Sequence, residues 1–203
     1  HEDCRRQRQM CIRDSYTYDL GDPLDVDSVI NKVGLPCFVK PNRSGSSYGV
    51  VKVYEKKDLK EAIHTALKED VQLIIEANLV GMEISVGAYR LNDQVTVLPI
   101  TEIISENDFF DYDAKYNGKS QEITPAGLDE TTINEIHSIV KKLFQQLELQ
   151  GVCRSEFIIV EGSPHLLEIN TIPGLTPASL IPQQVSAAGI ELAKFFESLL
   201  LKK

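Results

Sequence analysis

The sequence predicts an α+β protein in which antiparallel sheets carry helices packed on one side. Apolar and polar residues alternate over residues 82–91, and the turn residues Asn92-Asp93 lead from there into a further strand over residues 94–104. Residues 130–149 instead place apolar side chains at helical spacing, and two more strands around a tight turn at residues 161–163 follow them. Since successive strands are joined by turns rather than by crossover helices, neighbouring strands should be antiparallel.

Length and composition are those of an ordinary globular protein. With 203 residues the chain can bury one sizeable core or two small ones. Its net charge of -9 argues against a general nucleic-acid binder, although it is compatible with a local basic pocket for phosphate. No apolar run approaches the roughly 18 residues that a transmembrane helix needs, and no signal-peptide core is visible.

The cysteines indicate a reducing compartment. Cys4, Cys11, Cys37 and Cys153 lack the spacing of a metal site. Two of them, Cys37 and Cys153, lie in apolar strand-like segments, where a buried thiol is usual. We therefore expect a cytoplasmic protein.

The amino-terminal part of the chain alternates short strands and helices. Residues 1–15 show neither helical nor strand periodicity and are expected to be a non-native or disordered leader. A short helical patch follows over residues 26–33, and Asp58 with Glu61 forms a capping box that opens a helix ending near Lys68. The segments with strand character are residues 37–40, 49–54 and 72–76.

Two carboxylates are predicted to face each other on the later hairpin. A turn centred on Gly162 places Glu156 opposite Glu168 and Arg154 opposite Asn170. Like charges directly opposite each other destabilise a strand pair, so a hard, oxygen-liganded cation such as Mg²⁺ is the natural counter-charge. A solvated hairpin face with a chance acidic pair is the alternative interpretation.

A Gly/Ser loop at residues 43–49 follows Lys40, which ends a predicted strand. Glycines let the backbone approach a ligand, serine hydroxyls suit phosphate oxygens, and a lysine adds a point charge. The loop is not a Walker loop, because the Gly-Lys-Ser/Thr sequence opening onto a helix is missing. A plain hairpin turn is the alternative. Residues 76–79, after the next strand, have the groups to hold a planar base, and a strand-end turn is the default interpretation there.

Residues 105–127 form a long loop that mixes charged and aromatic side chains at residues 111–116, with Gly118 close behind. Loops this long are uncommon in compact domains unless they act as lids or binding loops. A lid can exclude water and bring a lysine to a transferring phosphate. A surface loop held by its tyrosines is the alternative. The chain then ends with an amphipathic helix from about Ile190.

Together these segments resemble the ATP-grasp enzymes and, within them, the D-alanine–D-alanine ligases. The resemblance runs from about Gly34 to the last helix. It is carried by Val39-Lys40-Pro41 with residues 45–49, Ile75-Glu76, residues 112–116, residues 124–127, residues 167–174 and Ser179-Leu180. It implies an ATP-grasp fold, in which two α+β subdomains with antiparallel sheets hold ATP between them. Residues 16–82 would form a partial central subdomain and residues 83–203 the C-terminal subdomain.

The resemblance also implies a role for individual residues. The residues implied to bind ATP are Lys40, Ser47, Glu76, Leu79, Glu83, Lys115 and Leu167. Those implied to hold two Mg²⁺ ions, or Mn²⁺ in their place, are Glu156, Glu168 and Asn170. Those implied to act on the reacting groups are Arg154 and the backbone of Gly174, with Ser46 and Tyr116 in a hydrogen-bond network that orients the amine. Ser179 and Leu180 would bind the carboxylate of the second amino acid.

The implied reaction is the ATP- and Mg²⁺-dependent ligation of two D-alanine molecules through an acyl phosphate, for peptidoglycan precursor synthesis. The implied partners are small molecules rather than nucleic acid or membrane, and members of this family are commonly homodimers. Three departures from the family pattern stand out. Glu156 replaces the usual aspartate, and Phe110 replaces a frequent tyrosine. The family's N-terminal domain is missing, with the first strand of the central domain and its ATP-contacting lysine, so the chain alone is expected to be inactive.

Two other functions are compatible with the sequence. The first is another ATP-grasp ligase, such as a D-alanine–D-lactate or amino-acid ligase, although Tyr116 favours a dipeptide former by resemblance. The second is a nucleotide-binding module without catalysis. A binder would not need the full phosphate and metal set, which is Lys40, Lys115, Arg154, Glu168 and Asn170.

Overall fold

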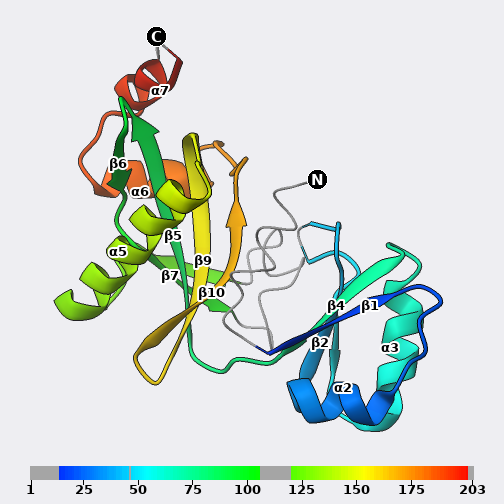
Figure 1. Ribbon diagram of the computed structural model, residues 1–203. Helices are drawn as coiled ribbons and strands as arrows, with labels where there is room; N and C mark the ends of the chain where they lie inside the picture. Colours follow the sequence, from blue (N-terminus) through cyan, green and yellow to red (C-terminus); the bar gives the residue numbers. More distant parts are fainter. Residues whose placement is uncertain (1–13, 46, 106–119, 201–203) are drawn as a thin grey trace. The chain divides into compact units, whose positions relative to one another are not determined.

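The computed structural model describes residues 14–45, 47–105 and 120–200, which form two compact units (Figure 1). The first unit is built on residues 14–80 and the second on residues 81–104 and 121–200. Each unit has its own sheet and its own hydrophobic core. Each therefore presents its own set of candidate functional groups.

The first unit is a four-stranded antiparallel sheet with two helices on one face. Its strands lie in the spatial order β1-β4-β2-β3. They are β1 (Ser15–Asp19), β2 (Cys37–Pro41), β3 (Val51–Val53) and β4 (Gln72–Ala77). The helices are α2 (Val26–Val33) and α3 (Leu59–Ala66), with the 3-10 turn η1 (Lys56–Asp58) directly before α3. The strands and helices predicted for this part of the chain are confirmed.

Alternation along these strands separates a core face from an open face. The side chains on the core face of β2 and β4 are Cys37, Val39, Leu73 and Ile75, all fully buried. They pack against α2 and α3, and burial of each aliphatic side chain stabilises the unit by roughly 1.5–3 kcal/mol. Phe38, Lys40 and Glu76 have the opposite parity and therefore lie on the open face.

Strand β1 is not among the strands that the sequence predicts, and it begins at Ser15, the last residue of the expected leader. Its five residues pair with β4, and Tyr16 and Tyr18 pack into the core of the unit. A five-residue strand carries a weak periodic signal, because its stability comes mainly from the partner strand. The pairing partner, at residues 72–76, lies far along the chain.

The start of α3 also differs from the prediction. Asp58 lies in helical conformation and its side chain makes no capping hydrogen bond, so the predicted capping box is wrong. The 3-10 turn ahead of α3 already continues the helical backbone, which leaves Asp58 inside the spiral rather than in front of it. Asp25 does cap α2, since its side chain accepts hydrogen bonds from the backbone N–H groups of Asp27 at 3.1 Å and Ser28 at 3.2 Å.

The second unit is a six-stranded sheet. Five strands lie in the order β10-β9-β5-β7-β8, and β6 pairs with β5 beside them. The strands are β5 (Met82–Leu91), β6 (Gln94–Val97), β7 (Thr101–Ser105), β8 (Ser120–Ile123), β9 (Gly151–Val160) and β10 (Ser163–Asn170). The helices are α5 (Glu130–Gln146), α6 (Leu180–Ala187) and α7 (Leu192–Leu200). No described helix is both long and apolar enough to cross a membrane.

Two expectations for this unit are corrected. The strand predicted over residues 94–104 is two strands, because Pro99 interrupts the run and cannot donate a ladder hydrogen bond. The loop predicted over residues 105–127 contains a strand, β8, at its far end.

Helices cover both faces of the second sheet rather than one. On one face, α5 packs Ile136, Val140 and Phe144 against the even-numbered core residues of β5. On the other, Ile181 and Val185 of α6 form a separate apolar cluster that includes Leu98 and Phe195. The one-sided arrangement predicted from the sequence therefore holds only for the first unit.

The two described cysteines have the environment that the sequence predicts. Cys37 and Cys153 are buried and carry free thiols. Burial raises the pKa of the Cys153 thiol to about 11 and also raises the pKa of Cys37. Both thiols are therefore packing groups rather than nucleophiles. Cys4 and Cys11 lie outside the described residues.

Candidate active site

Four polar side chains of the β9–β10 hairpin share one face of the second sheet. The turn residues Glu161 and Gly162 both have positive φ, 49° and 83°, as in a two-residue type I′ turn. The predicted pairs are both present, Glu156 with Glu168 and Arg154 with Asn170. The turn alone would not produce them, because it centres between two residues rather than on one. A bulge between Leu166 and Glu168 supplies the extra residue and turns Glu168 onto this face.

The buried carboxylate of this face already has a counter-charge. A guanidinium nitrogen of Arg154 lies 2.6 Å from Oε1 of Glu156, and their side chains are only 17% and 4% exposed. Arg154, on the same strand as Glu156, thus partly neutralises the acidic pair. The sequence had predicted a bound cation as the counter-charge. A buried pair of this kind is strongly coupled, because loss of either partner leaves an uncompensated charge.

Two buried polar atoms near this pair have unused hydrogen-bonding capacity. Within the described part of the chain, neither Nε of Arg154 nor Oγ of Ser85 has a hydrogen-bond partner. Ser85 pairs with Glu156 across β5 and β9, so both atoms belong to the same patch. Buried polar atoms without partners are rare in folded proteins and are typical of sites that await a ligand or water.

The oxygen atoms of the hairpin fit a hard cation. Glu156 and Glu168 provide carboxylates, and Oδ1 of Asn170 is oriented by the backbone N–H of Ile172 at 3.0 Å. Among the residues that the structure describes, no group of three or more His, Cys, Asp and Glu side chains gathers as a metal cage. Two carboxylates and one amide suit an ion that completes its shell with phosphate oxygens and water, as Mg²⁺ does.

The loop after β10 brings Gly174 against Ser179. A Cβ atom on Gly174 would lie 2.7 Å from Oγ of Ser179, so a larger residue would force the Ser179 hydroxyl to move. Oγ of Ser179 also lies 2.8 Å from Oγ1 of Thr176. Ser179 is the N-cap of α6, yet its side chain makes no capping hydrogen bond, and Leu180 behind it is buried. The Ser179 hydroxyl therefore lies close to Gly174 at the start of α6.

The open face of the first sheet carries a lysine, a glutamate and an aromatic ring. Nζ of Lys40 lies 2.9 Å from Oε2 of Glu76, whose side chain is 4% exposed. Nζ of Lys40 and Nζ of Lys52 lie 5.5 Å and 5.4 Å from the centre of the Phe38 ring, within cation–π range. Phe38 and Lys52 are not among the predicted site residues. Their cross-strand pairing is the signal that could have placed them beside Lys40.

The Gly/Ser loop has a backbone that requires glycine. Gly49 has a φ of 74°, and a Cβ atom there would lie 2.9 Å from side-chain carbons of Glu69 and Pro41. Ser47 also has a positive φ, 59°, and the Ser44 hydroxyl donates to the carbonyl of Tyr48 at 2.9 Å. The loop is therefore a tight, internally bonded turn with exposed small residues, which is compatible with covering phosphate groups.

Arg43 and Asp70 hold the start of this loop. The guanidinium of Arg43 forms a close ion pair with Asp70, and the backbone N–H of Arg43 donates to the same carboxylate at 2.8 Å. The backbone N–H of Gln72 adds a further bond at 3.2 Å. These hydrogen bonds, with the one from the Arg43 side chain as the largest contribution, lower the pKa of Asp70 to about 2.

Replacing Asp70 with asparagine should destabilise the protein by about 2 kcal/mol at neutral pH, because the lowered pKa of a carboxylate is stabilising above its unfolded pKa. This contribution should disappear as the pH falls from about 4 through the folded pKa of about 2. Urea unfolding of both proteins between pH 7 and pH 2 measures this contribution.

Asp27→Asn is the matched control, since Asp27 and its partner Lys56 are 72% and 53% exposed. It should lose less than about 1 kcal/mol. An Asp70→Asn protein as stable as the parent at pH 7 would contradict the assignment.

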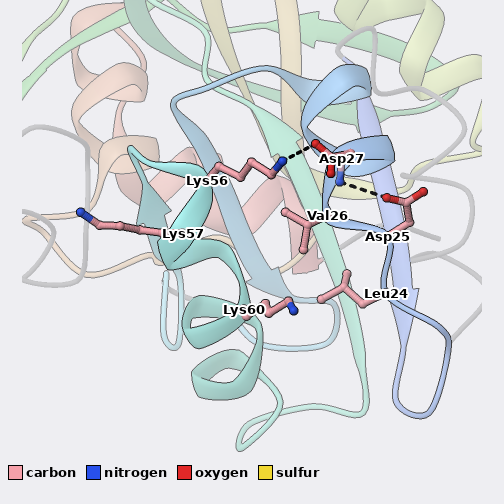
Figure 2. Close-up of a pocket in the computed structure, with 7 residues that line it drawn as sticks. All are labelled: Leu24, Asp25, Val26, Asp27, Lys56, Lys57 and Lys60. Carbon is pink, nitrogen blue, oxygen red and sulfur yellow. Dashed lines mark hydrogen bonds and ion pairs between the residues drawn. The ribbon is translucent and has the colours of Figure 1, made fainter.

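A hollow of about 510 Å³ lies elsewhere on the first unit (Figure 2). Its lining residues are Leu24, Asp25, Val26, Asp27, Lys56, Lys57 and Lys60. They come from the start of α2 and from η1 and α3, which cover the helix side of the sheet. The hollow therefore does not include the open face that carries Lys40 and Glu76.

The remaining predicted residues are only partly placed. Glu83 has the parity of the hairpin face and pairs with Ile158, Leu79 is half-buried just after β4, and Leu167 is the bulge residue. Ser46, Lys115 and Tyr116 lie outside the described residues, as does Phe110. Their predicted roles stay predictions.

Several known proteins that are similar to this chain are D-alanine–D-alanine ligases. A family model described as "D-ala D-ala ligase C-terminus" matches residues 17–201. A D-alanine–D-alanine ligase of Flavobacterium johnsoniae is 52% identical over 182 residues, which are 90% of this chain. One of Phocaeicola vulgatus is 48% identical over 89% of the chain. The chain spans 56% of the length of each of these relatives.

Solved structures of the same group share the fold. The D-alanine–D-alanine ligase of Bacillus anthracis matches with a TM-score of 0.80 and 27% identity, over 99% of this chain and 64% of that one. The VanG D-Ala:D-Ser ligase of Enterococcus faecalis matches with a TM-score of 0.78 and 26% identity, over 98% and 59%. The predicted ATP-grasp fold class is thereby confirmed. On the extent of the family match, the chain belongs to the D-ala D-ala ligase C-terminus family.

Proposed function

We propose that the protein containing this chain ligates two D-alanine molecules at the expense of ATP, for peptidoglycan precursor synthesis. The observation that carries the proposal is the hairpin face with Arg154, Glu156, Glu168 and Asn170, found in a chain that is 52% identical to a D-alanine–D-alanine ligase. The face combines a cation for a developing oxyanion with oxygen ligands for a metal that binds phosphate. A cytoplasmic homodimer is part of the proposal.

The first unit is proposed to bind the nucleotide. Lys40 would place a point charge on the phosphates, and Ser46 and Ser47 would cover them from the Gly/Ser loop. Glu76 would hold the adenine amine, with the backbone of Leu79 beside it. In the structure the buried Glu76 is held by Lys40. This contact keeps both side chains in place on the open face.

The second unit is proposed to bind the metal and the reacting groups. Glu156, Glu168 and Asn170 would hold Mg²⁺, which neutralises phosphate charge when bound. Glu83 would bind the ribose, Leu167 would lie beside the nucleotide, and Lys115 would reach the phosphates. Ser179 and Leu180 would bind the carboxylate of the second D-alanine at the start of α6.

The chemistry proceeds in two steps in this proposal. The carboxylate of the first D-alanine takes the terminal phosphoryl group of ATP and becomes an acyl phosphate, with ADP as the leaving group. The amine of the second D-alanine, oriented by Ser46 and Tyr116, then attacks the acyl carbon, and inorganic phosphate leaves. Arg154 and the backbone N–H of Gly174 would stabilise the oxyanion that forms during this attack. Water must be excluded from the site, because water would hydrolyse the acyl phosphate.

A different second substrate is the alternative. The structural match to a D-Ala:D-Ser ligase, at a TM-score of 0.78, is nearly as good as the match to a D-alanine–D-alanine ligase at 0.80. The fold therefore suits more than one acceptor, and the higher sequence identity to D-alanine–D-alanine ligases supports D-alanine.

Phosphate release from ATP by the full-length protein tests the proposal. Release should require Mg²⁺ and D-alanine, and a panel of D-alanine, D-serine and D-lactate as second substrate should favour D-alanine. Glu168→Gln should abolish release, because it removes a charged metal ligand. Glu161→Gln, in the exposed turn of the same hairpin, is the matched control and should retain it. ATP hydrolysis at the same rate with and without D-alanine would contradict the proposal.

A further inference from the structure

One side chain of α6, that of Gln184, is a completely buried amide. Gln184 is 0% exposed, whereas its neighbours in the cluster, Ile181 and Val185, are apolar. Burying an amide among apolar groups is unfavourable unless each polar atom is hydrogen-bonded. A glutamine at this position therefore needs a specific set of partners.

Gln184 finds partners on two strands of the sheet. Its Oε1 accepts a hydrogen bond from the backbone N–H of Gly87 at 2.9 Å. Its Nε2 donates to the carbonyl of Ser85 and to Oγ1 of Thr101, each at 2.9 Å. The backbone partners also define which end of the amide is oxygen, since an N–H group must donate and a carbonyl must accept. The side chain thus has one orientation and ties α6 to β5 and β7.

The hydrogen-bond network of Gln184 extends to Thr124, and it depends on a glycine at position 87. Oγ1 of Thr101 lies 2.6 Å from Oγ1 of Thr124, which extends the chain of polar groups to the segment after β8. A Cβ atom on Gly87 would lie 2.4 Å from Oε1 of Gln184 and 2.6 Å from Cδ1 of Ile181. The close approach of α6 to the sheet is therefore possible only because residue 87 has no side chain.

The strand residues that hold Gln184 are the direct neighbours of the candidate active site. Across β5 and β9, Gly87 pairs with Arg154 and Ser85 pairs with Glu156. At its other end, α6 begins at Leu180 with Ser179 as its N-cap. Gln184 is five residues from Ser179, which is about 7.5 Å along a helix axis. The N-terminal half of α6 therefore connects the Gln184 anchor to Ser179.

We propose that Gln184 is a positioning residue that sets the distance between Ser179 on α6 and Arg154 on β9. This inference rests on the proposed function, in which Ser179 binds the carboxylate of the amine-donating amino acid and Arg154 faces the reacting carbonyl. Gln184 touches neither substrate. Its amide holds the helix that carries one binding group against the strand next to the other, so that the amine lies within reach of the acyl carbon.

Gln184→Met in the full-length protein tests the inference. Methionine has a similar volume but removes all three hydrogen bonds, so α6 loses its anchor. The KM for the amine-donating D-alanine should rise about tenfold, whereas the KM for ATP should stay unchanged. Thr101→Val removes one of the three hydrogen bonds of Gln184, together with the bond between Thr101 and Thr124, and should raise the same KM by a smaller factor.

Controls separate positioning from stability. Ile136→Val, in the α5 core on the opposite face of the sheet, should lower stability in urea without changing the KM for either substrate. A wild-type KM for D-alanine in folded Gln184→Met would overturn the inference. If Gln184→Met does not fold, an unchanged KM in Thr101→Val overturns it instead. Absence of D-alanine-dependent phosphate release by the unmodified protein is a different result, because it rejects the proposed function itself.

Discussion

Replacing Arg154 with methionine should lower kcat of the full-length protein by about two to three orders of magnitude. A single donor to a developing oxyanion is worth about 10²–10³ in rate, and Arg154 is the partly buried cation of the hairpin face. Removing it also leaves the carboxylate of Glu156 buried without its partner. Initial rates of D-alanine-dependent phosphate release measure the effect, together with urea unfolding to report stability.

Two further variants make this result interpretable. Arg154→Lys keeps the ion pair with Glu156 but loses the planar guanidinium, so it should fold and still lose at least about tenfold in kcat. Arg90→Met is the matched control, because Arg90 is also partly buried and its guanidinium donates to the carbonyl of Phe144 at 2.8 Å, at the end of α5. It should reduce stability and leave kcat near the parent value. Equal losses of kcat in Arg90→Met and Arg154→Met would show that Arg154 acts through the fold alone.

Replacing Gly81 with alanine should destabilise the protein by about 3 kcal/mol. A Cβ atom at this position would lie 2.0 Å from the backbone oxygen of Ile159 and 2.8 Å from its carbonyl carbon. A backbone group cannot rotate away as a side chain can, so the β5–β9 pairing that begins at Met82 and Ile159 has to shift. Chemical denaturation with the parent protein as reference measures the change in the free energy of unfolding.

Gly127→Ala is the matched control for this prediction. A Cβ atom on Gly127 meets nothing within 4 Å, and its φ is not in the left-handed region. Alanine there should be neutral or should stabilise by up to about 1 kcal/mol, because it reduces the freedom of the unfolded chain. Similar losses in both variants would contradict the steric explanation for Gly81.

Local patterns predict much of this fold. The apolar stripes of α3 and α5 and the alternation along β5 are visible in the sequence, because helical and strand periodicities depend on near neighbours. The same reasoning predicts the pairing of Glu156 with Glu168, and the structure confirms it. The route differs, however, because a bulge rather than a centred turn produces the register.

Local patterns do not predict structural features that depend on residues far apart in the sequence. Strand β1 exists because β4 pairs with it, and the alternation of its own five residues is too short to predict it. Lys52 and Phe38 meet on the open face through strand pairing. The Asp58 capping box fails because the 3-10 turn ahead of it changes the local backbone.

The order of the residues is enough to predict which side chains meet on the hairpin face. A strand of alternating side chains places Arg154 with Glu156, and a short turn returns Glu168 and Asn170 to them. Residue order does not predict the contacts that hold the Gly/Ser loop of the first unit or helix α6 of the second unit. Arg43 meets Asp70 across 27 residues and Gln184 meets Gly87 across 97, through hydrogen bonds that form only when separate elements pack. Periodicity records what neighbouring residues share, whereas a buried polar contact between distant segments depends on the three-dimensional fold.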